Sequence, residues 1–221
     1  MKLTIVAATG GIGKQLVAQA LAAGHDVTAV ARRPRELPAD VRVVTADLAA
    51  PDPAVLESAV RGRDAVLSAL GPRTRADAGV VAPGTRALVE AMWSTGVTRL
   101  AVVSAAAIGT VPTPRNPHPP KHDPGDGLVM RRLLNPAVKR VLAAGYADLA
   151  VMEEELRDTA LEWTVVRPPR LTDKPLTGRY RVALDRNLRR GLTISRADVA
   201  HLMLDALHRP ELVGHSVGIA Y

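Results

Sequence analysis

The residues with the clearest chemical potential lie near the N-terminus, in the run Ala7-Ala8-Thr9-Gly10-Gly11-Ile12-Gly13. The run follows a short apolar segment and opens into a helical pattern, which is the setting of a dinucleotide-binding turn. Gly10 and Gly13 have the spacing for close approach to a diphosphate and for helix–strand packing, while Ala7 replaces the usual first glycine. The first N–H groups of a helix bind phosphate oxygens, so we predict nucleotide binding. An ordinary structural turn is the alternative.

The end of the second expected strand, Val30-Ala31-Arg32-Arg33-Pro34-Arg35, indicates which dinucleotide fits. An acidic residue about 20 positions after the glycines binds the ribose of NAD, whereas an arginine accommodates the 2′-phosphate of NADP. Arg32 lies 19 residues after Gly13, and no acid stands in this run. We therefore predict NADP(H) as the cofactor, with Arg32 and Arg33 in its site. A solvent-exposed turn in an arginine-rich chain is the alternative.

Two further strand ends belong to the same cleft if the strands are parallel. Asp47 follows the third expected strand and can accept a hydrogen bond from an adenine amino group. Leu70 and Gly71 follow the fourth expected strand, where backbone would pass the cofactor. Each of these positions is also compatible with an ordinary turn.

These residues require a fold that brings several strand ends together, and the chain has the pattern for one. Apolar runs alternate with helical patterns, which implies a parallel sheet covered by helices on both faces. We predict a doubly wound, Rossmann-like α/β fold, forming a single domain over residues 1–221 with a small C-terminal lobe on the substrate side. The expected strands are 2–7, 27–31, 41–45, 65–70, 99–104, 163–166, 192–195 and 216–220, and the expected helices are 11–23, 54–60, 83–95, 128–144, 148–159 and 196–207.

The alternation breaks after Ile108, where residues 109–127 hold six prolines and three glycines. We interpret 109–147 as an inserted loop followed by a helix, and expect it to form a lid or wall beside the reacting part of the cofactor. A surface elaboration or a dimer contact is the alternative. Farther on, Glu153, Glu154 and Glu155 fall in the early turns of the expected helix 148–159, where the helix dipole and solvation would explain them.

Composition excludes several classes of protein. The 221-residue chain has no cysteine, so disulfides and thiolate catalysis are excluded, and no apolar run is long enough for a membrane helix. The net charge is +7, but only five residues are aromatic, so stacking platforms for nucleic acid are nearly absent. His118 and His122 lie among prolines rather than on a helix, and we expect no metal site. A cytoplasmic protein that binds neither nucleic acid nor membrane is the simplest expectation.

Three runs in the second half of the chain complete a family pattern. They are WTVVRPPRLTD at 163–173, PLTGRY at 175–180 and ISRADVA at 194–200. Together with the glycine-rich turn, they resemble the atypical short-chain dehydrogenase/reductase group, in its NAD(P)H-binding (NmrA-like) part. The chain looks most like the flavin reductase/biliverdin-IXβ reductase branch, over nearly its whole length except 109–147.

The resemblance implies roles for individual residues. It assigns the diphosphate to Thr9, Gly10, Gly11, Ile12 and Gly13, the 2′-phosphate to Arg32, and the adenine side to Asp47 and Leu48. It places Ser104 beside the nicotinamide and Pro168, Pro169 and Arg170 along the nicotinamide and substrate pocket. Arg170 stands where that branch has a histidine, and a second histidine of the reductases aligns near Leu149. The resemblance therefore leaves the substrate and the proton source open, and these two departures affect only that side of the site, not the cofactor site.

The available acid–base chemistry is narrow. Carbonyl reduction in the larger family uses a tyrosine with a lysine four residues later, but the residues four beyond Tyr146 and Tyr180 are Ala150 and Leu184. We take Ser104 and Arg170 as the candidate catalytic residues. The alternatives are a structural hydrogen bond for Ser104 and a contact with cofactor phosphates for Arg170. Tyr146 is a lone candidate acid, with a packing role as the more ordinary interpretation.

These observations favour an NADPH-dependent oxidoreductase that transfers hydride to a small conjugated acceptor such as a flavin, a quinone or a similar carbonyl compound. Such acceptors take hydride from the cofactor and collect a proton from water. A non-catalytic NADP(H)-binding sensor and a redox-neutral isomerase or cyclase remain alternatives, because a fold does not determine a reaction. We expect a small-molecule substrate and a monomer or weak homodimer.

Overall fold

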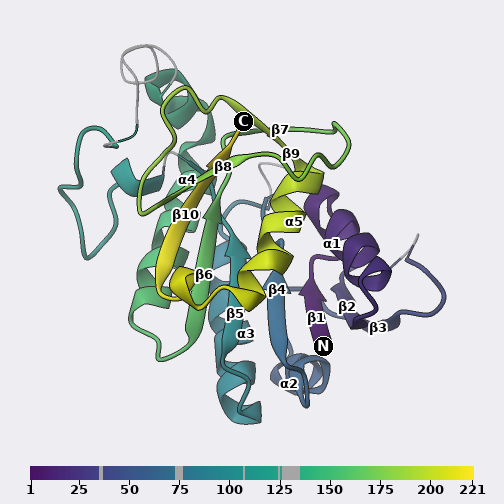
Figure 1. Cartoon of the computed structure of the whole chain (residues 1–221). Helices are drawn as coiled ribbons and strands as arrows, with labels where there is room; N and C mark the ends of the chain where they lie inside the picture. Colours follow the sequence, from purple (N-terminus) through teal and green to yellow (C-terminus); the bar gives the residue numbers. More distant parts are fainter. Residues whose placement is uncertain (35–36, 73–76, 107, 124, 126–134) are drawn as a thin grey trace.

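A computed structural model describes residues 1–34, 37–72, 77–106, 108–123, 125 and 135–221. Within these residues, eight strands form one sheet, with neighbouring strands parallel except for the last pair, which is antiparallel (Figure 1). The sheet confirms the predicted doubly wound α/β fold. Across the sheet, the strands are β3 (Arg42–Thr45), β2 (Asp26–Ala31), β1 (Lys2–Val6), β4 (Ala65–Ser68), β5 (Arg99–Val103), β6 (Glu162–Arg167), β10 (His215–Ala220) and β8 (Arg181–Leu184).

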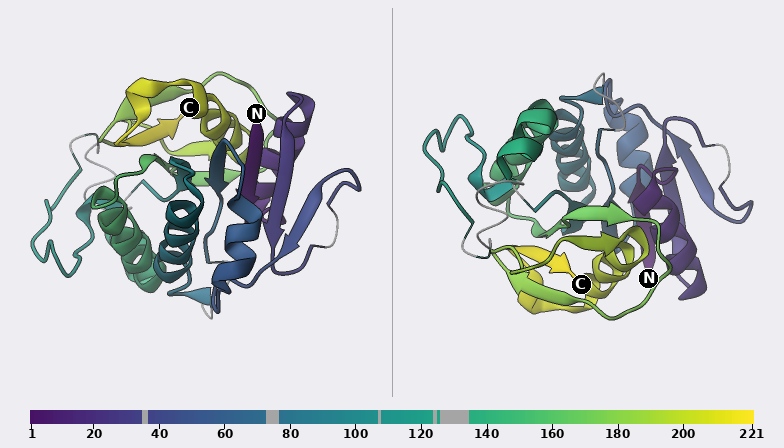
Figure 2. Two further views of the ribbon diagram at one scale, coloured as in Figure 1. Left: turned by 90° about the horizontal axis from the view of Figure 1, so that it is seen from below. Right: turned by 90° about the horizontal axis from the view of Figure 1, so that it is seen from above.

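Two helical layers cover the sheet, because its central strands are apolar on both faces. On one face, α1 (Gly11–Ala22) packs along α5 (Arg196–Asp205). On the other face, α2 (Pro53–Val60), α3 (Val81–Thr95) and α4 (Asn135–Arg157) lie in a row (Figure 2). The chain order reverses between β1 and β4, and ligands of open α/β sheets bind at the carboxyl ends of the strands beside such a point.

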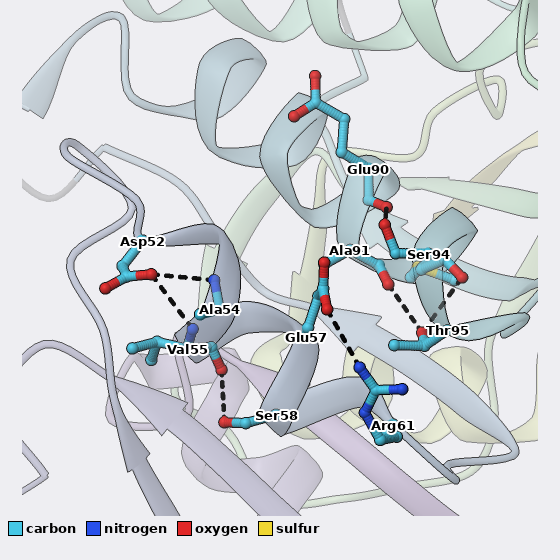
Figure 3. Close-up of polar contacts among 11 residues, drawn as sticks. Asp52, Ala54, Val55, Glu57, Ser58, Arg61, Glu90, Ala91, Ser94 and Thr95 are labelled. Atoms are coloured by element: carbon cyan, nitrogen blue, oxygen red, sulfur yellow. Dashed lines mark hydrogen bonds and ion pairs between the residues drawn. The ribbon is translucent and has the colours of Figure 1, made fainter.

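The helix ends follow the chemistry of their residues. Asp52 accepts hydrogen bonds from the N–H groups of Ala54 (2.9 Å) and Val55 (3.4 Å), which caps α2 (Figure 3). Gly96 ends α3 in the left-handed conformation (φ 74°), as expected for a glycine at that position. Ser195 caps α5 by accepting from the N–H of Asp198 at 2.9 Å, which confirms the predicted start of this helix.

The helix α4 corrects one expectation. Residues 135–157 form a single helix, whereas we expected two helices separated near residue 145. Gly145 lies inside α4, where a Cβ would be 3.3 Å from Cγ of Pro72, so this glycine permits a close approach instead of ending a helix. The expected helical residues 128–134 lie outside the described part of the chain.

A small lobe follows β6 and returns to the sheet. Its strands β7 (Arg170–Thr172) and β9 (Thr193–Ser195) pair with each other, and β8 joins the main sheet from the same region. β7 and β8 were not expected, because each has only three or four residues, beginning with an arginine, and neither lies in an apolar run as long as the one that marked β4. The short strand expected at 192–195 is confirmed as β9.

The lobe is tied together by one buried carboxylate. Asp198 accepts hydrogen bonds from the N–H groups of Thr177 (3.0 Å) and Gly178 (2.8 Å), and from the hydroxyls of Ser195 (2.8 Å) and Tyr221 (2.6 Å). Burial raises the pKa of the Asp198 carboxyl, but these hydrogen bonds outweigh burial and hold the pKa below its usual value. Across the described residues, no helix is both long and apolar enough to span a membrane.

Candidate functional site

The turn between β1 and α1 is a tightly packed cradle. The N–H of Gly10 donates to the carbonyl oxygen of Ala7 at 2.9 Å, and Ala7 has a left-handed φ of 56°. A Cβ at Gly13 would overlap that same carbonyl oxygen, so the helix can pack here only on a glycine. The chain thus keeps the geometry of a diphosphate-binding turn even though alanine occupies its first position. The strain of a left-handed alanine is about 1–2 kcal/mol.

A groove opens beside this turn, at the carboxyl ends of β1, β2 and β4. Seven of the residues that we predicted to bind the cofactor line it, and six others join them, among them Asp77 and Val80, to which sequence analysis gave no role. The predicted residues in its wall are Thr9, Arg32, Arg33, Asp47, Leu48, Leu70 and Gly71. Their cofactor-binding roles stay predictions, but the structure brings them together.

Arg32 is an exposed cation of this groove, as is its neighbour Arg33. The Arg32 side chain is 46% exposed, and its Nη1 lies 3.6 Å from Oδ1 of Asp77. Such a distance in a solvated pair corresponds to a weak interaction, so the guanidinium can accept another anion in the groove. Asp77 lies 45 positions beyond Arg32 and no local pattern marks it, which explains why the sequence did not reveal this carboxylate.

Asp47, which we predicted to face the adenine, is exposed just after the end of β3. Its carboxylate accepts a hydrogen bond from the N–H of Ala49 at 3.1 Å, which fixes the turn that follows. Leu48 is buried beneath the groove, and Gly84 of α3 lies so close that a Cβ there would be 3.1 Å from Cβ of Leu48. The wall of the groove is therefore supported by the packing of α3.

A second set of predicted residues lies at the ends of β5 and β6, and none of its members lines the groove. Ser104 is buried, and its hydroxyl donates to Oε1 of Glu153 at 2.6 Å. The same carboxylate, only 1% exposed, binds Arg167 through Nε at 3.0 Å and also through Nη2. Burial lowers the pKa of Arg167, but hydrogen bonding to Glu153 and the charges of nearby carboxylates outweigh burial and raise it.

Glu153 corrects a further expectation. We expected Glu153 to be solvated in the early turns of a helix, but it lies in the C-terminal half of α4 and faces the protein interior. A carboxylate in that half gains nothing from the helix dipole, so Arg167 and Ser104 account for its place. The sequence signal was the arginine at the end of an apolar strand, which requires a buried acid.

The hydrogen bond to Glu153 determines whether Ser104 can donate or accept a hydrogen bond at a ligand. Because its hydroxyl hydrogen is directed to the Glu153 carboxylate, the serine oxygen presents only lone pairs to any ligand. Ser104 can therefore accept a hydrogen bond from an amide N–H, and it cannot donate one to a substrate carbonyl without breaking the bond to Glu153.

The remaining residues of this set have different surroundings. Pro168 is buried, and its carbonyl oxygen accepts from the N–H of Ala106 at 2.9 Å, which holds the ends of β5 and β6 together. Pro169 lines a small separate pocket with Ala106 and Arg167. Arg170 is exposed at the start of β7, where it pairs in register with Thr193. The catalytic roles of Ser104 and Arg170 stay predictions.

Tyr146 is partly buried against the apolar core between the sheet and α4. Burial raises the pKa of its phenol, so this tyrosine is a weaker acid than a free one. A lysine-assisted proton donor requires the opposite shift. The packing role is therefore the better interpretation of Tyr146.

Of the insertion predicted at 109–147, the structure describes residues 109–123, 125 and 135–147, and the loop 109–123 lies on the side of the sheet formed by β10 and β8 (Figure 1). Thr113 donates to the carboxylate of Glu154 on α4, and Asp123 accepts from the N–H of Asn187 at 2.8 Å. These residues do not contribute to the groove wall. The idea of a lid stays a prediction, and residues 126–134 of the insertion lie outside the described chain.

The residues present fit a dinucleotide. The turn packs on Gly13 as a diphosphate-binding turn does, and the groove beside it is lined by Arg32 and Arg33. Among the described residues, no three histidine or acidic side chains gather to hold a metal ion. When bound, a reduced nicotinamide supplies a hydride, and the protein orients it.

Comparison with known proteins agrees with this geometry. A family model described as NAD(P)H-binding matches residues 7–210. An uncharacterized protein of Mycobacterium tuberculosis is 33% identical over 106 residues, which is 48% of this chain. The chain spans only 12% of the length of that relative.

Solved structures share the fold across the whole chain. A short-chain dehydrogenase/reductase of Veillonella parvula, in complex with NADP, has a TM-score of 0.77 and 19% identity, over 100% of this chain and 94% of its own. A Streptococcus pneumoniae protein, described as a proposed NADH-flavin reductase, has a TM-score of 0.74 and 24% identity, over 100% of this chain and 99% of its own.

Proposed function

Because this chain belongs to the NAD(P)H-binding family, we propose that it is an NADPH-dependent reductase of a small conjugated acceptor, such as a flavin or a quinone. The exposed Arg32 carries the cofactor assignment, because it lines the groove at the end of β2 with only a loosely held partner. An arginine at this position accommodates the 2′-phosphate of NADP. The structural neighbour that holds NADP supports the same choice.

At the reacting end, Ser104 orients the nicotinamide. Its oxygen accepts a hydrogen bond from the carboxamide N–H, because its own hydrogen is directed to Glu153. Pro168 and Pro169 form the adjoining wall, and Arg170 binds an anionic group of the acceptor from the start of β7. In this arrangement, the protein positions the two reactants and supplies no proton.

The choice of acceptor follows from the two candidate proton donors that we considered, Tyr146 and Ser104, since neither is suited to protonate a substrate. A simple ketone needs an acid at its oxygen as hydride arrives, whereas a flavin or quinone spreads the charge over a conjugated system. Tyr146 has a raised pKa, and Ser104 has its hydrogen directed away from the substrate. The neighbour described as a proposed NADH-flavin reductase agrees with this class of acceptor.

Turnover assays test the proposal. Purified protein should oxidise NADPH with FMN or a quinone faster than with a panel of ketones, and faster than it oxidises NADH. Tight NADPH binding without oxidation by any acceptor would instead support a redox sensor. Conversion of a substrate without net consumption of NADPH would support a redox-neutral isomerase.

A separate experiment tests whether Ser104 accepts a hydrogen bond from the carboxamide of the cofactor. An NADPH analogue with an acetyl group in place of the carboxamide has no N–H to donate. Wild-type protein should use this analogue less well than NADPH, and Ser104→Ala should treat the two alike. A Ser104→Ala variant that keeps the full preference for the carboxamide would contradict the assignment.

We also propose that the protein acts on a small molecule in the cytoplasm as a monomer or weak homodimer. Among the described residues, Arg32 and Arg33 lie together in the groove, so part of the positive charge has a small anionic ligand to bind. Sedimentation of the purified protein at several concentrations measures the assembly state.

A further inference from the structure

Arg196, the first residue of α5, lies directly over the glycine-rich turn. A Cβ built on Gly11 would be only 2.6 Å from Cδ and 2.7 Å from Nε of Arg196. The Arg196 side chain thus occupies the space that any larger residue at position 11 would need. Gly11 is not one of the two glycines that the spacing assigned to the turn itself, so its lack of a side chain has a specific use here.

The guanidinium of Arg196 is held by a partner that can be replaced. Its Nη1 lies 2.6 Å from Oδ1 of Asp173, whose side chain is 88% exposed, while the Arg196 side chain is 31% exposed. An ion pair with so exposed an acid is weak because water competes with both groups. A phosphate offers stronger, charge-assisted hydrogen bonds to a guanidinium, and arginine is well suited to bind two of its oxygens.

The backbone of Arg196 is firmly placed. Ser195, just before it, caps α5, and the buried Asp198, two residues after it, collects hydrogen bonds from Thr177, Gly178 and Tyr221. The lobe that carries β7 and Arg170 is therefore connected to Arg196 through buried polar contacts. A cation fixed in this way needs only a side-chain movement to change its partner.

We propose that Arg196 binds the diphosphate of the cofactor, opposite the first N–H groups of α1, and exchanges Asp173 for that diphosphate when the cofactor binds. The inference rests on NAD(P)H binding at the turn, which the proposed function shares, but not on any particular reaction. Arg196 comes from the C-terminal lobe and the turn comes from the N-terminus. The diphosphate therefore joins the cofactor-binding half of the molecule to the proposed substrate side.

Calorimetric titration with two ligands tests this role. NADP⁺ carries the diphosphate, and adenosine 2′-monophosphate carries the 2′-phosphate without it. Arg196→Ala should weaken NADP⁺ binding by roughly 10-fold or more, the scale of a charge-assisted phosphate contact, and leave the affinity for adenosine 2′-monophosphate unchanged. Arg32→Ala should weaken both ligands.

A matched control removes the same charge elsewhere. Arg61 forms an exposed ion pair with Glu57 at the end of α2, 3.1 Å from Nη2 to Oε2 (Figure 3). This position follows α2 and precedes β4, which runs parallel to β1, so Arg61 lies at the amino ends of these strands while the turn lies at the carboxyl end of β1. Arg61→Ala should leave the affinity for both ligands as in the wild type.

A second variant keeps the proposal testable from the other side of the contact. Gly11→Ala places a methyl group where the Arg196 stem lies, so it should weaken NADP⁺ and spare adenosine 2′-monophosphate. Combined with Arg196→Ala, it should add little, because residues in contact give non-additive effects. Full additivity would overturn the proposal.

The outcomes separate this inference from the proposed reaction. Wild-type protein that binds NADP⁺ but oxidises NADPH with no acceptor contradicts the reductase and leaves Arg196 as assigned. A folded Arg196→Ala variant with wild-type NADP⁺ affinity overturns the assignment of Arg196 alone. An equal loss for both ligands also overturns it, because the effect would then not depend on the diphosphate. Wild-type protein that binds neither ligand contradicts both proposals.

Discussion

The two halves of the sheet treat their charged side chains in opposite ways. In the half built from β1 to β4, Arg32 stands 46% exposed in a groove, 3.6 Å from its carboxylate partner. In the half built from β5, β6 and β10, Arg167 is 5% exposed and bound by Glu153 through two of its nitrogens. The same type of residue is available to a ligand in one half and fully occupied by the protein in the other.

The exposed arginine is suited to binding a ligand, whereas the buried arginine is suited to holding the structure in place. A cation with a solvated, distant partner can be recruited by an incoming phosphate at little cost, whereas a buried pair cannot be separated without leaving a charge uncompensated. The first half therefore leaves its charge available to an anionic ligand, as the proposed binding of the cofactor by Arg32 requires. The second half uses its charge to fix Ser104, whose hydroxyl donates to the same carboxylate.

The largest expected effect breaks the buried pair. Glu153→Gln should lower the free energy of unfolding by about 3–5 kcal/mol, because Arg167 loses its buried counter-charge. Urea denaturation measures the loss. Glu57→Gln, at the exposed pair with Arg61, is the control and should cost less than about 1 kcal/mol. A small loss in the free energy of unfolding for Glu153→Gln would mean that the two halves do not differ as described. Replacing both residues of the buried pair, with Glu153→Leu and Arg167→Met, should recover much of the stability.

The next largest expected effect concerns cofactor affinity in the groove and leaves the stability of the fold unchanged. Arg32→Ala should weaken NADPH binding by roughly 10- to 100-fold, since a hydrogen bond to a charged group contributes about 1.5–3 kcal/mol and 1.4 kcal/mol is tenfold. NADH affinity and the free energy of unfolding should stay close to those of the wild type. Parallel titrations with the two dinucleotides measure the change. Equal losses for NADPH and NADH would show that Arg32 does not read the 2′-phosphate.

A pH effect tests the second buried acid of the C-terminal half. Asp198 has a pKa below its usual value, so the folded protein holds fewer protons there than the unfolded chain. Its contribution to stability is complete above the ordinary carboxyl pKa and is lost as the pH falls toward the lowered folded value. Urea denaturation at a series of acidic pH values should show a steeper loss for the wild type than for Asp198→Asn. Parallel curves for the two proteins would disprove this role.

The smallest effect lies in the turn. Ala7→Gly should raise the free energy of unfolding by roughly 0.5–1 kcal/mol, because glycine adopts a left-handed φ without strain but loses more backbone entropy on folding. Thermal unfolding measures this gain. Ala8→Gly, at the next position, where φ is negative, should instead destabilise the protein. Two variants with the same sign would mean that Ala7 is not strained.

The features that the sequence predicted are those with a local signal. The strand–glycine–helix run and the arginine after β2 depend on neighbours a few residues apart, so their pattern is readable without the fold. Seven predicted residues accordingly meet in one groove. The Arg32–Asp77 and Arg196–Asp173 pairs join residues separated by 45 and 23 positions, and no local period marks either pair. They arise only when the sheet and the lobe are assembled.

Glu153 shows why a pattern can be interpreted wrongly. Three consecutive glutamates at the expected start of a helix indicate solvation, and only the course of α4 past β6 directs one of them inward. The expected break between residues 144 and 148 was also wrong, because Gly145 lies inside α4, where its lack of a side chain permits the approach of Pro72. Both errors have the same cause. Glu153 and Gly145 are each unfavourable in their local setting, and a tertiary contact accounts for each of them.

The position of β10 has a consequence for how the protein is made. This strand comes from residues 215–220, yet it pairs with β6 on one side and β8 on the other. During synthesis, the outer edge of β6 therefore has no strand to pair with until β10 has left the ribosome. Exposed strand edges are sites of aggregation. A ribosome-stalled chain ending before residue 215 should depend on chaperones more than one that includes β10, even though the glycine turn and its groove have already been synthesised.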